Sequence, residues 1–183
     1  MIRKLLIGAG ILVVLLGAAY FYFSYRGYQL SPKAEASVIN GKFKVDIKYC
    51  APSVRDRLVF GEEGEEALQP YGRYWRLGAN EATEITFNQD VLFLDQEVKK
   101  GTYVMYAIPG KNYFDIGLNN ETGRWGYAEV DHEKDVVNVK VPVTSSDHTE
   151  QFTIKLEKLY DNSAKIIFNW SDKQWEIPVI SNQ

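Results

Sequence analysis

The sequence predicts an all-β domain, a sandwich or jelly-roll-like fold of about nine or ten strands, preceded by one N-terminal transmembrane helix. Residues 5–25 contain no formal charge. After residue 36 the dominant hydrophobic period is two, the spacing of a strand with one solvated face. Turn-forming residues separate these alternating segments, and no convincing helical period occurs among them.

The uncharged run would span about 32 Å as a helix, close to the hydrocarbon thickness of a bilayer. Arg3 and Lys4 precede it, so the positive-inside rule favours a cytoplasmic N-terminus in the cell membrane and a periplasmic C-terminal domain. A cleaved signal peptide is the alternative, because Gly17-Ala18-Ala19 resembles a small-residue cleavage site. We favour a retained signal-anchor, since apolar residues continue to Phe23.

We therefore divide the chain into a membrane segment at 1–25, a short polar linker at 26–36 and a β-sandwich domain at 37–183. Without Arg3 and Lys4 the chain has 19 basic and 24 acidic residues, a balance that argues against nucleic acid as a partner. Cys50 is the only cysteine, which excludes an internal disulfide and a thiol metal cluster. We expect no cofactor.

Each predicted strand is an alternating or short apolar segment. In chain order they are residues 36–39, 43–49, 84–88, 91–94, 102–108, 113–118, 137–143, 152–156, 164–170 and 175–180. Asn40-Gly41 predicts a tight turn between the first two, and Pro109-Gly110 predicts a hairpin between 102–108 and 113–118. We expect a last hairpin that turns near residues 171–173. Residues 62–69 are the one helical candidate, of at most two turns.

Two stretches, residues 49–61 and 70–83, resist the alternating pattern and are rich in arginine and aromatic residues. Their motifs are Pro-Ser-Val-Arg-Asp-Arg at 52–57, Phe-Gly at 60–61 and the tryptophan–arginine segment at 71–83, followed by Gly-Thr-Tyr at 101–103 and Ile-Pro-Gly at 108–110.

In these motifs the chain resembles the bacterial family called domain of unknown function 2911, common in the Bacteroidetes. The resemblance covers roughly residues 38–179, and residues 62–69 depart from it by being longer and more acidic. It implies an extracytoplasmic β domain and brings no activity with it.

The two stretches carry the candidate ligand-binding residues, which are Arg55, Arg57, Tyr74, Trp75, Arg76, Asn80 and Glu81. Their arginines, with Arg73, can clamp a carboxylate or phosphate, and Tyr74 and Trp75 can stack on a sugar or another flat group. In the alternative interpretation these residues are structural. Arg57 and Arg76 would then bind backbone carbonyls or Glu81, while Trp75 would fill one end of the sandwich.

Other polar groups give weaker signals. Glu81 and Glu84 could form an acid–base pair, but Glu84 falls on the solvated phase of its strand. Asp131, Glu133 and Asp135 have the spacing of a calcium loop without its glycine and distal glutamate, so a solvated acidic loop is expected. The two histidines lack zinc-site spacing, and we expect no metal.

Three hypotheses follow. The first is a non-enzymatic membrane-anchored module that binds a small anionic ligand, a glycan or an envelope protein. The second is an envelope hydrolase that uses Glu81 as its acid or base. The third is a purely structural component of a membrane complex. A concave pocket with Arg76 and Glu81 directed into it would favour the first two.

Overall fold

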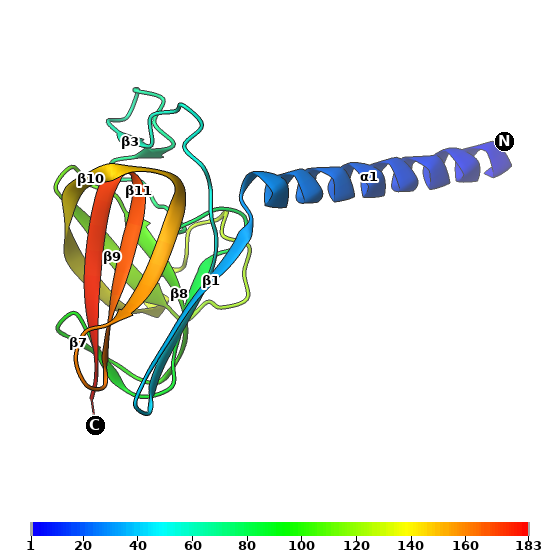
Figure 1. The fold of residues 1–183 in the computed structure, drawn as a ribbon. Coiled ribbons are helices and arrows are strands. Elements are labelled where there is room, and N and C mark those ends of the chain that lie inside the picture. The colour runs from blue at the N-terminus through cyan, green and yellow to red at the C-terminus, as the bar shows by residue number, and fades with distance from the viewer. Residues whose placement is uncertain (1, 183) are drawn as a thin grey trace.

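The computed structural model describes residues 2–182, and its N-terminal helix α1 (Ile2–Leu30) extends away from a β domain (Figure 1). The stretch Leu6–Leu30 is long and apolar enough to cross a membrane, and none of it is buried inside the protein. The side chains from Tyr20 to Phe23 are exposed, as are the large apolar side chains between Leu6 and Leu16. Such a helix is stable in hydrocarbon, because all its backbone hydrogen bonds are internal.

The domain is built on one antiparallel sheet of nine strands. In spatial order they are β1 (Lys33–Asn40), β2 (Phe43–Cys50), β5 (Thr83–Phe87), β8 (Gly101–Ile108), β9 (Tyr113–Asn119), β10 (Asp135–Lys158), β11 (Ser163–Ser181), β6 (Val91–Phe93) and β7 (Gln96–Val98). A short parallel pair, β3 (Phe60–Gly61) and β4 (Gln69–Pro70), lies outside this sheet, and one 3-10 turn, η1 (His132–Lys134), precedes β10.

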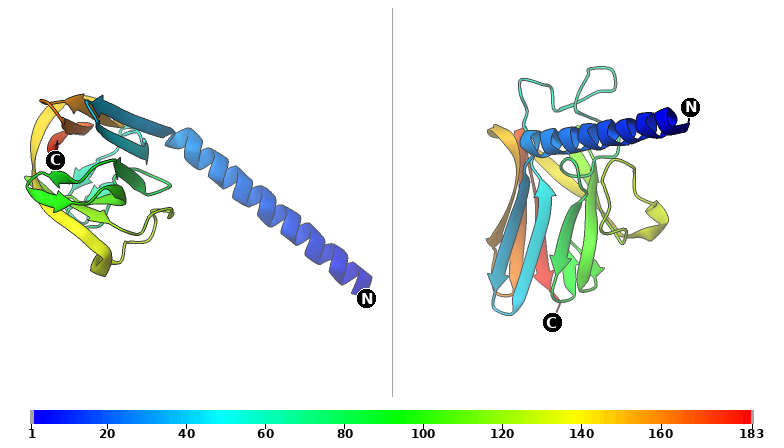
Figure 2. Two further views of the ribbon diagram at one scale, coloured as in Figure 1. Left: turned by 90° about the horizontal axis from the view of Figure 1, so that it is seen from below. Right: turned by 90° about the vertical axis from the view of Figure 1, so that its right-hand side faces the viewer.

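Two long strands fold the sheet over itself. The first part of β10 pairs with β9, and the rest pairs with β11, with register shifts between Ser145 and Thr153. Irregularities of this kind bend a strand and increase its twist. Seen from below, the sheet curves round a central core (Figure 2, left). Alternate residues of β2, such as Phe43, Val45 and Ile47, are fully buried in that core, as their period of two predicts.

One end of the core is aromatic. Trp75 stacks on Trp170 with ring centroids 5.3 Å apart, and both contact Phe152. Phe60 packs edge-on against Trp75 and Trp175. Offset and edge-on aromatic pairs add about 0.5–1.5 kcal/mol each beyond the burial of their surface, so this cluster fixes the loops that carry its members.

The predicted fold class is confirmed, as are the turn after Asn40 and the hairpin formed by β8 and β9. The predicted last hairpin is wrong. Residues 163–181 form the single strand β11, in which Ser171 has a positive φ and lies at a register shift instead of a turn. Similarly, 137–143 and 152–156 are parts of one strand, β10. Serine and aspartate at a bulge mimic the residues of a turn.

Two further expectations differ from the structure. Residues 62–68 form turns between β3 and β4, Gln69 already belongs to β4, and the segment contains no helix; Gly64 within it has a positive φ. In the region expected to be a linker, α1 continues to Leu30 and β1 begins at Lys33. Only Ser31 and Pro32 separate the helix from the sheet. Hydrogen bonding to the domain already begins at Pro32, whose carbonyl accepts a hydrogen bond from the Ala51 amide.

Candidate functional site

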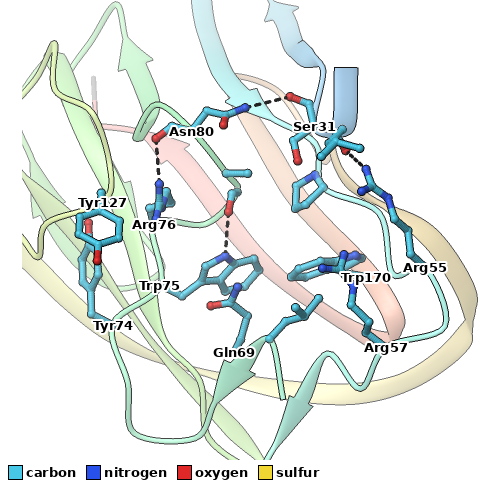
Figure 3. A pocket seen from close by; sticks show the side chains of 15 residues that line it. Ser31, Arg55, Arg57, Gln69, Tyr74, Trp75, Arg76, Asn80, Tyr127 and Trp170 are labelled. Carbon is cyan, nitrogen blue, oxygen red and sulfur yellow. Dashed lines mark hydrogen bonds between the residues drawn. The ribbon is translucent and has the colours of Figure 1, made fainter. Parts of the chain in front are cut away.

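A cavity of about 480 Å³ opens at the end of the domain that joins α1, beside the aromatic end of the core (Figure 3). Six of the seven candidate residues line it; only Glu81 does not. We call it the arginine cavity. It is lined by Leu30, Ser31, Pro52, Arg55, Arg57, Leu68, Gln69, Tyr74, Trp75, Arg76, Gly78, Ala79, Asn80, Tyr127 and Trp170. The two stretches that interrupt the alternating pattern therefore meet at one place.

The loops that form the cavity have unusual backbone geometry. Positive φ angles occur at Arg55, Asp56, Leu77 and Asn80, which are half of the non-glycine residues with this geometry in the described chain. Leu77 is fully buried, and its φ is +51°. Left-handed geometry in a residue such as leucine costs on the order of 1–3 kcal/mol and often marks ligand sites. The surrounding packing holds the loops in this conformation.

Arg76 lies on the side of the cavity next to Asn80 (Figure 3). Its Nη1 donates a hydrogen bond to the carbonyl of Asn80 at 3.0 Å, and the guanidinium lies 6.0 Å from the centre of the Tyr127 ring. Burial lowers the pKa of Arg76 from its usual value, because a charge in a partly dry site loses hydration. Arginine remains a cation despite such a shift. One backbone bond leaves most of its five donors free for a ligand.

Arg55 and Arg57 lie on the other side of the tryptophan pair. Arg57 donates to the carbonyls of Val54 at 2.9 Å and Ser53 at 2.7 Å, which holds its own loop. Arg55 donates from Nη2 to the carbonyl of Leu30, the last residue of α1. A cation at this position also interacts favourably with the helix dipole. The structural role predicted for Arg57, binding backbone carbonyls, is thus present, and Arg55 has the same kind of role without having been predicted to; both keep free donors.

Trp75 and Trp170 form the floor of the cavity. They are 2% and 1% exposed, and the indole Nε1 of Trp75 donates to the carbonyl of Gly78 at 3.1 Å. The Nε1 of Trp170 is buried without a hydrogen-bond partner among the described residues, and so is the hydroxyl of Tyr74. A buried donor without an acceptor costs about 1–3 kcal/mol, so each is a position where a ligand or water would be stabilised.

Asn80 joins the cavity to the helix. Its Nδ2 lies 3.3 Å from the carbonyl of Gly27 and 3.3 Å from that of Ser31. The Gly27 carbonyl lies in the last turn of α1 and also accepts the Ser31 amide at 2.9 Å, whereas the Ser31 carbonyl lies just beyond the helix. Asparagine suits this position because it tolerates a positive φ. Gly27 packs closely against Asn80, since a Cβ at Gly27 would stand 3.1 Å from Asn80 Oδ1.

Glu81 is directed away from the arginine cavity, into a second surface hollow with Lys33 and Trp125. Its Oε1 accepts hydrogen bonds from Tyr28 Oη at 2.7 Å and Lys33 Nζ at 2.9 Å. Burial alone would raise the pKa of Glu81, but the bonds from Lys33 and Tyr28 outweigh this and lower it. A carboxylate held ionised by two donors is a weak base and a poor proton donor. Among the described residues, the Glu81 carboxylate forms no hydrogen bond or ion pair with a candidate arginine.

The charge of the cavity has one sign. Its lining contains three arginines and no acidic residue, and no carboxylate of the described residues forms an ion pair with Arg55, Arg57 or Arg76. Arg73, from the same stretch, instead forms an ion pair with Glu63 at the surface. Three unpaired guanidinium groups around a partly enclosed space create a positive potential.

Besides Tyr127, five lining residues outside the two stretches were not among the sequence candidates. Leu30 ends α1 and Ser31 follows it, Leu68 precedes β4, Gln69 lies in β4, and Trp170 comes from β11. Only Trp170 carried a signal, since it falls on the buried phase of a predicted strand. Tyr127, which follows β9 in the chain, also lines the cavity.

The acidic loop before β10 has a local role. Asp131 accepts a hydrogen bond from the Glu133 amide at 3.1 Å and forms an ion pair with Lys134 at 3.1 Å. Asp135 accepts from Tyr106 and Asn119 instead of facing Asp131. No group of three or more histidine, cysteine or acidic side chains within residues 2–182 is arranged to hold a metal ion.

A protein-family model described as "Protein of unknown function (DUF2911)" matches residues 31–179 of the chain. The match begins at the end of α1 and includes every residue of the arginine cavity except Leu30. The chain matches no curated protein and no solved structure.

Proposed function

The chain belongs to the family described as Protein of unknown function (DUF2911), and we propose that it is a membrane-anchored, extracytoplasmic module that binds a small anionic ligand in the arginine cavity. The observation that carries this proposal is the unpaired state of Arg55, Arg57 and Arg76 around one cavity without a carboxylate. Desolvating a guanidinium group is costly unless an anion compensates it. A carboxylate or phosphate group supplies that compensation.

The ligand is expected to be small and rich in acceptors. The cavity offers guanidinium donors, and the buried Nε1 of Trp170 and hydroxyl of Tyr74 in its lining residues have no hydrogen-bond partner among the described residues. A hydrogen bond from a charged donor contributes about 1.5–3 kcal/mol, so two or three of them would give specific binding. Stacking of a sugar is less favoured, because the faces of Trp75 and Trp170 pack against each other in the core.

The membrane orientation is part of the same proposal. Arg3 and Lys4 before the apolar segment support a cytoplasmic N-terminus and a periplasmic domain. Retention of α1 is supported by its bonds to the domain, since Gly27 and Leu30 accept from Asn80 and Arg55. The mass of the mature protein tests this directly. A chain that begins at Tyr20 would reduce the anchor to a signal peptide.

The binding proposal can be tested by calorimetric titration and thermal unfolding of the full chain in nanodiscs, with inorganic phosphate and acetate as probes at constant ionic strength. A probe at 100 times its Kd would stabilise the domain by about 2.7 kcal/mol. Arg57→Gln and Arg76→Gln should each weaken binding at least tenfold, since each removes about 1.5–3 kcal/mol of charge-assisted bonding.

Arg73→Gln is the matched control, because Arg73 comes from the same stretch but pairs with Glu63 outside the cavity. It should leave anion binding unchanged. If neither anion binds, or if Arg73→Gln weakens binding as much as Arg76→Gln, the arginine cavity is not the site. The structural interpretation of its arginines would then stand alone.

A further inference from the structure

A second surface feature is independent of the cavity's charge. The loop at residues 120–131, between β9 and η1, exposes two aromatic side chains, and we call it the aromatic loop. Trp125 is 51% exposed and Tyr127 is 82% exposed. Tryptophan and tyrosine side chains combine an apolar ring with one polar group, and they are enriched where a membrane meets water.

The aromatic loop lies beside the end of α1. The ring of Trp125 is packed edge-on against Tyr28, with centroids 6.5 Å apart. Tyr28 is three residues beyond Tyr25, where the uncharged run ends, which corresponds to about 4.5 Å along a helix axis. The headgroup layer on each side of the hydrocarbon is about 5–7 Å thick. If α1 crosses the bilayer, Trp125 lies at the depth of the headgroups.

The loop is held in this position by backbone bonds to the cavity wall. The amide of Gly126 donates to the carbonyl of Asn80 at 3.0 Å, and the amide of Ala82 donates to the carbonyl of Arg124 at 3.2 Å. A Cβ at Gly126 would stand 2.6 Å from Arg76 Cδ, so the loop packs closely on that side chain. The exposure of Trp125 and Tyr127 is therefore fixed by the fold.

The charges of the aromatic loop do not favour a purely electrostatic contact with an anionic membrane surface. Arg124 is bonded to Glu121 and to the carbonyls of Ala128 and Glu129, so its charge is partly neutralised. Glu129 and Glu133 are exposed nearby and would repel an anionic surface. Apolar and aromatic burial at the lipid–water interface remains as the favourable contribution.

We propose that the aromatic loop docks on the lipid–water interface of the bilayer that α1 enters, with Trp125 and Tyr127 among the headgroups. This inference rests on the proposed anchoring of α1, and it adds a second point of contact. A second contact fixes the rotation of the domain about the helix axis. The arginine cavity, which shares Tyr127 and Leu30 with these elements, then opens at a defined height above the membrane.

The test is fluorescence quenching of the full chain in nanodiscs of phosphatidylcholine brominated near the headgroup end of its acyl chains. Trp75, Trp170 and Trp175 are at most 2% exposed, so a lipid quencher reports on Trp125. We expect Trp125 to lose at least half of its emission, and Trp125→Phe to abolish the quenching. Because the contact is apolar, the quenching should persist in 0.5 M salt, about five-fold above the ionic strength at which the Debye length is about 10 Å.

The matched control places tryptophan at the far end of the domain. Tyr160 is exposed, and its carbonyl accepts a hydrogen bond from Asn40. Asn40 is at the end of β1 opposite α1, about 23 Å along the strand from Lys33. The variant Trp125→Phe/Tyr160→Trp should show no quenching. Quenching that is equal at both positions would mean that the domain lies on the bilayer without orientation, and would overturn the proposal.

Extraction with alkaline carbonate separates this proposal from the anchoring itself. A chain that stays in the membrane fraction while Trp125 is unquenched would overturn the docking of the aromatic loop, which would then be available to a protein partner. A chain released by carbonate would contradict the anchor, and the docking proposal would fall with it.

Discussion

The hydroxyl of Tyr28 donates a 2.7 Å hydrogen bond to Oε1 of Glu81, and this bond joins the last turn of helix α1 to the strand entry of the β domain. Lys33 donates to the same oxygen at 2.9 Å. At the same helix end, Asn80 and Arg55 donate to the carbonyls of Gly27 and Leu30. The helix therefore meets the domain through fixed polar contacts at its C-terminal end.

The hydrogen bond from Tyr28 to Glu81 should contribute more to the free energy of unfolding than the ion pair between Lys33 and Glu81. Tyr28→Phe removes a partly buried bond to a charged acceptor, for which we expect a loss of about 1 kcal/mol in the free energy of unfolding, after allowing for the exposure of Glu81. Lys33→Ala removes an ion pair in which Lys33 is 62% exposed, and it should cost about 0.5 kcal/mol or less.

Urea unfolding of the full chain in detergent measures both values. Hydrogen exchange of the amides around Ser31 gives a local reading, and it should increase in Tyr28→Phe. A larger loss for Lys33→Ala than for Tyr28→Phe would contradict the assigned order of the two contacts.

Gly78 marks a close approach of two chain segments. A Cβ at this position would stand 2.7 Å from the backbone carbonyl of Cys50 and 3.2 Å from Thr83 Oγ1. Gly78→Ala should therefore displace the loop that carries Trp75 and Arg76 and cost about 1–3 kcal/mol, the usual range for overpacking.

Gly72 is the control for this substitution. It has a φ of +75° and nothing within 4 Å of its Cβ position, so Gly72→Ala pays only backbone strain of about 1–2 kcal/mol. The two variants should differ in anion affinity, because only Gly78→Ala should disturb the arginine cavity. Unaltered phosphate binding in Gly78→Ala would show that the loop accommodates the methyl group.

The strands with a solvated face were readable from the sequence because polar and apolar residues alternate in them. Phe43, Val45 and Ile47 are buried as their spacing predicts. The long strand β11 was not readable, since Ser171-Asp172-Lys173 has the composition of a turn but forms an irregular point in a continuous strand. Local composition does not distinguish a bulge from a turn, because both need the same backbone freedom.

The candidate site, like the strands, could be predicted from the sequence only in part. Arg55, Arg57, Trp75, Arg76 and Asn80 were found by composition, and they share one cavity. Glu81 follows Asn80 directly but faces the other way, because Asn80 has a φ of +56° and the chain turns there. Contributions from Leu30 and Trp170 come from segments distant in sequence, and only the fold brings them to the cavity.

Trp170 and Trp175 provide a comparison of two buried indoles. Each is 1% exposed and has an Nε1 without a hydrogen-bond partner in the described residues, but only Trp170 lines the arginine cavity. Trp170→Phe and Trp175→Phe should therefore destabilise the domain by similar amounts, on the order of 1–3 kcal/mol for lost volume.

Anion affinity should distinguish them. If the Nε1 of Trp170 donates to the ligand, Trp170→Phe weakens phosphate binding about fivefold to tenfold, the equivalent of one hydrogen bond of about 1–1.5 kcal/mol. Trp175→Phe should leave the affinity unchanged. An equal loss in both variants would indicate that the aromatic end of the core acts on the cavity only through packing.

His132 predicts a dependence of stability on pH. Its Nε2 lies 3.0 Å from Glu129, its Nδ1 lies 2.8 Å from Asp135, and the hydroxyl of Tyr106 donates to the same Asp135. Hydrogen bonds to Glu129 and then to Asp135 raise the pKa of His132 above its usual value of 6.5. Folding therefore favours the protonated imidazole.

The stabilisation is fully present below the pKa of the unfolded chain, near 6.5, and is lost as the pH rises through the higher pKa of the folded protein. The free energy of unfolding should decrease across this interval by less than about 1 kcal/mol, because His132 is partly exposed. In His132→Gln the decrease should disappear, whereas His148→Gln, in an exposed position, should retain it. Urea unfolding at several pH values from 5.5 to 8.5 measures the effect, and a stability that rises over this range in the wild type but not in His132→Gln would reverse the assigned direction of the pKa shift.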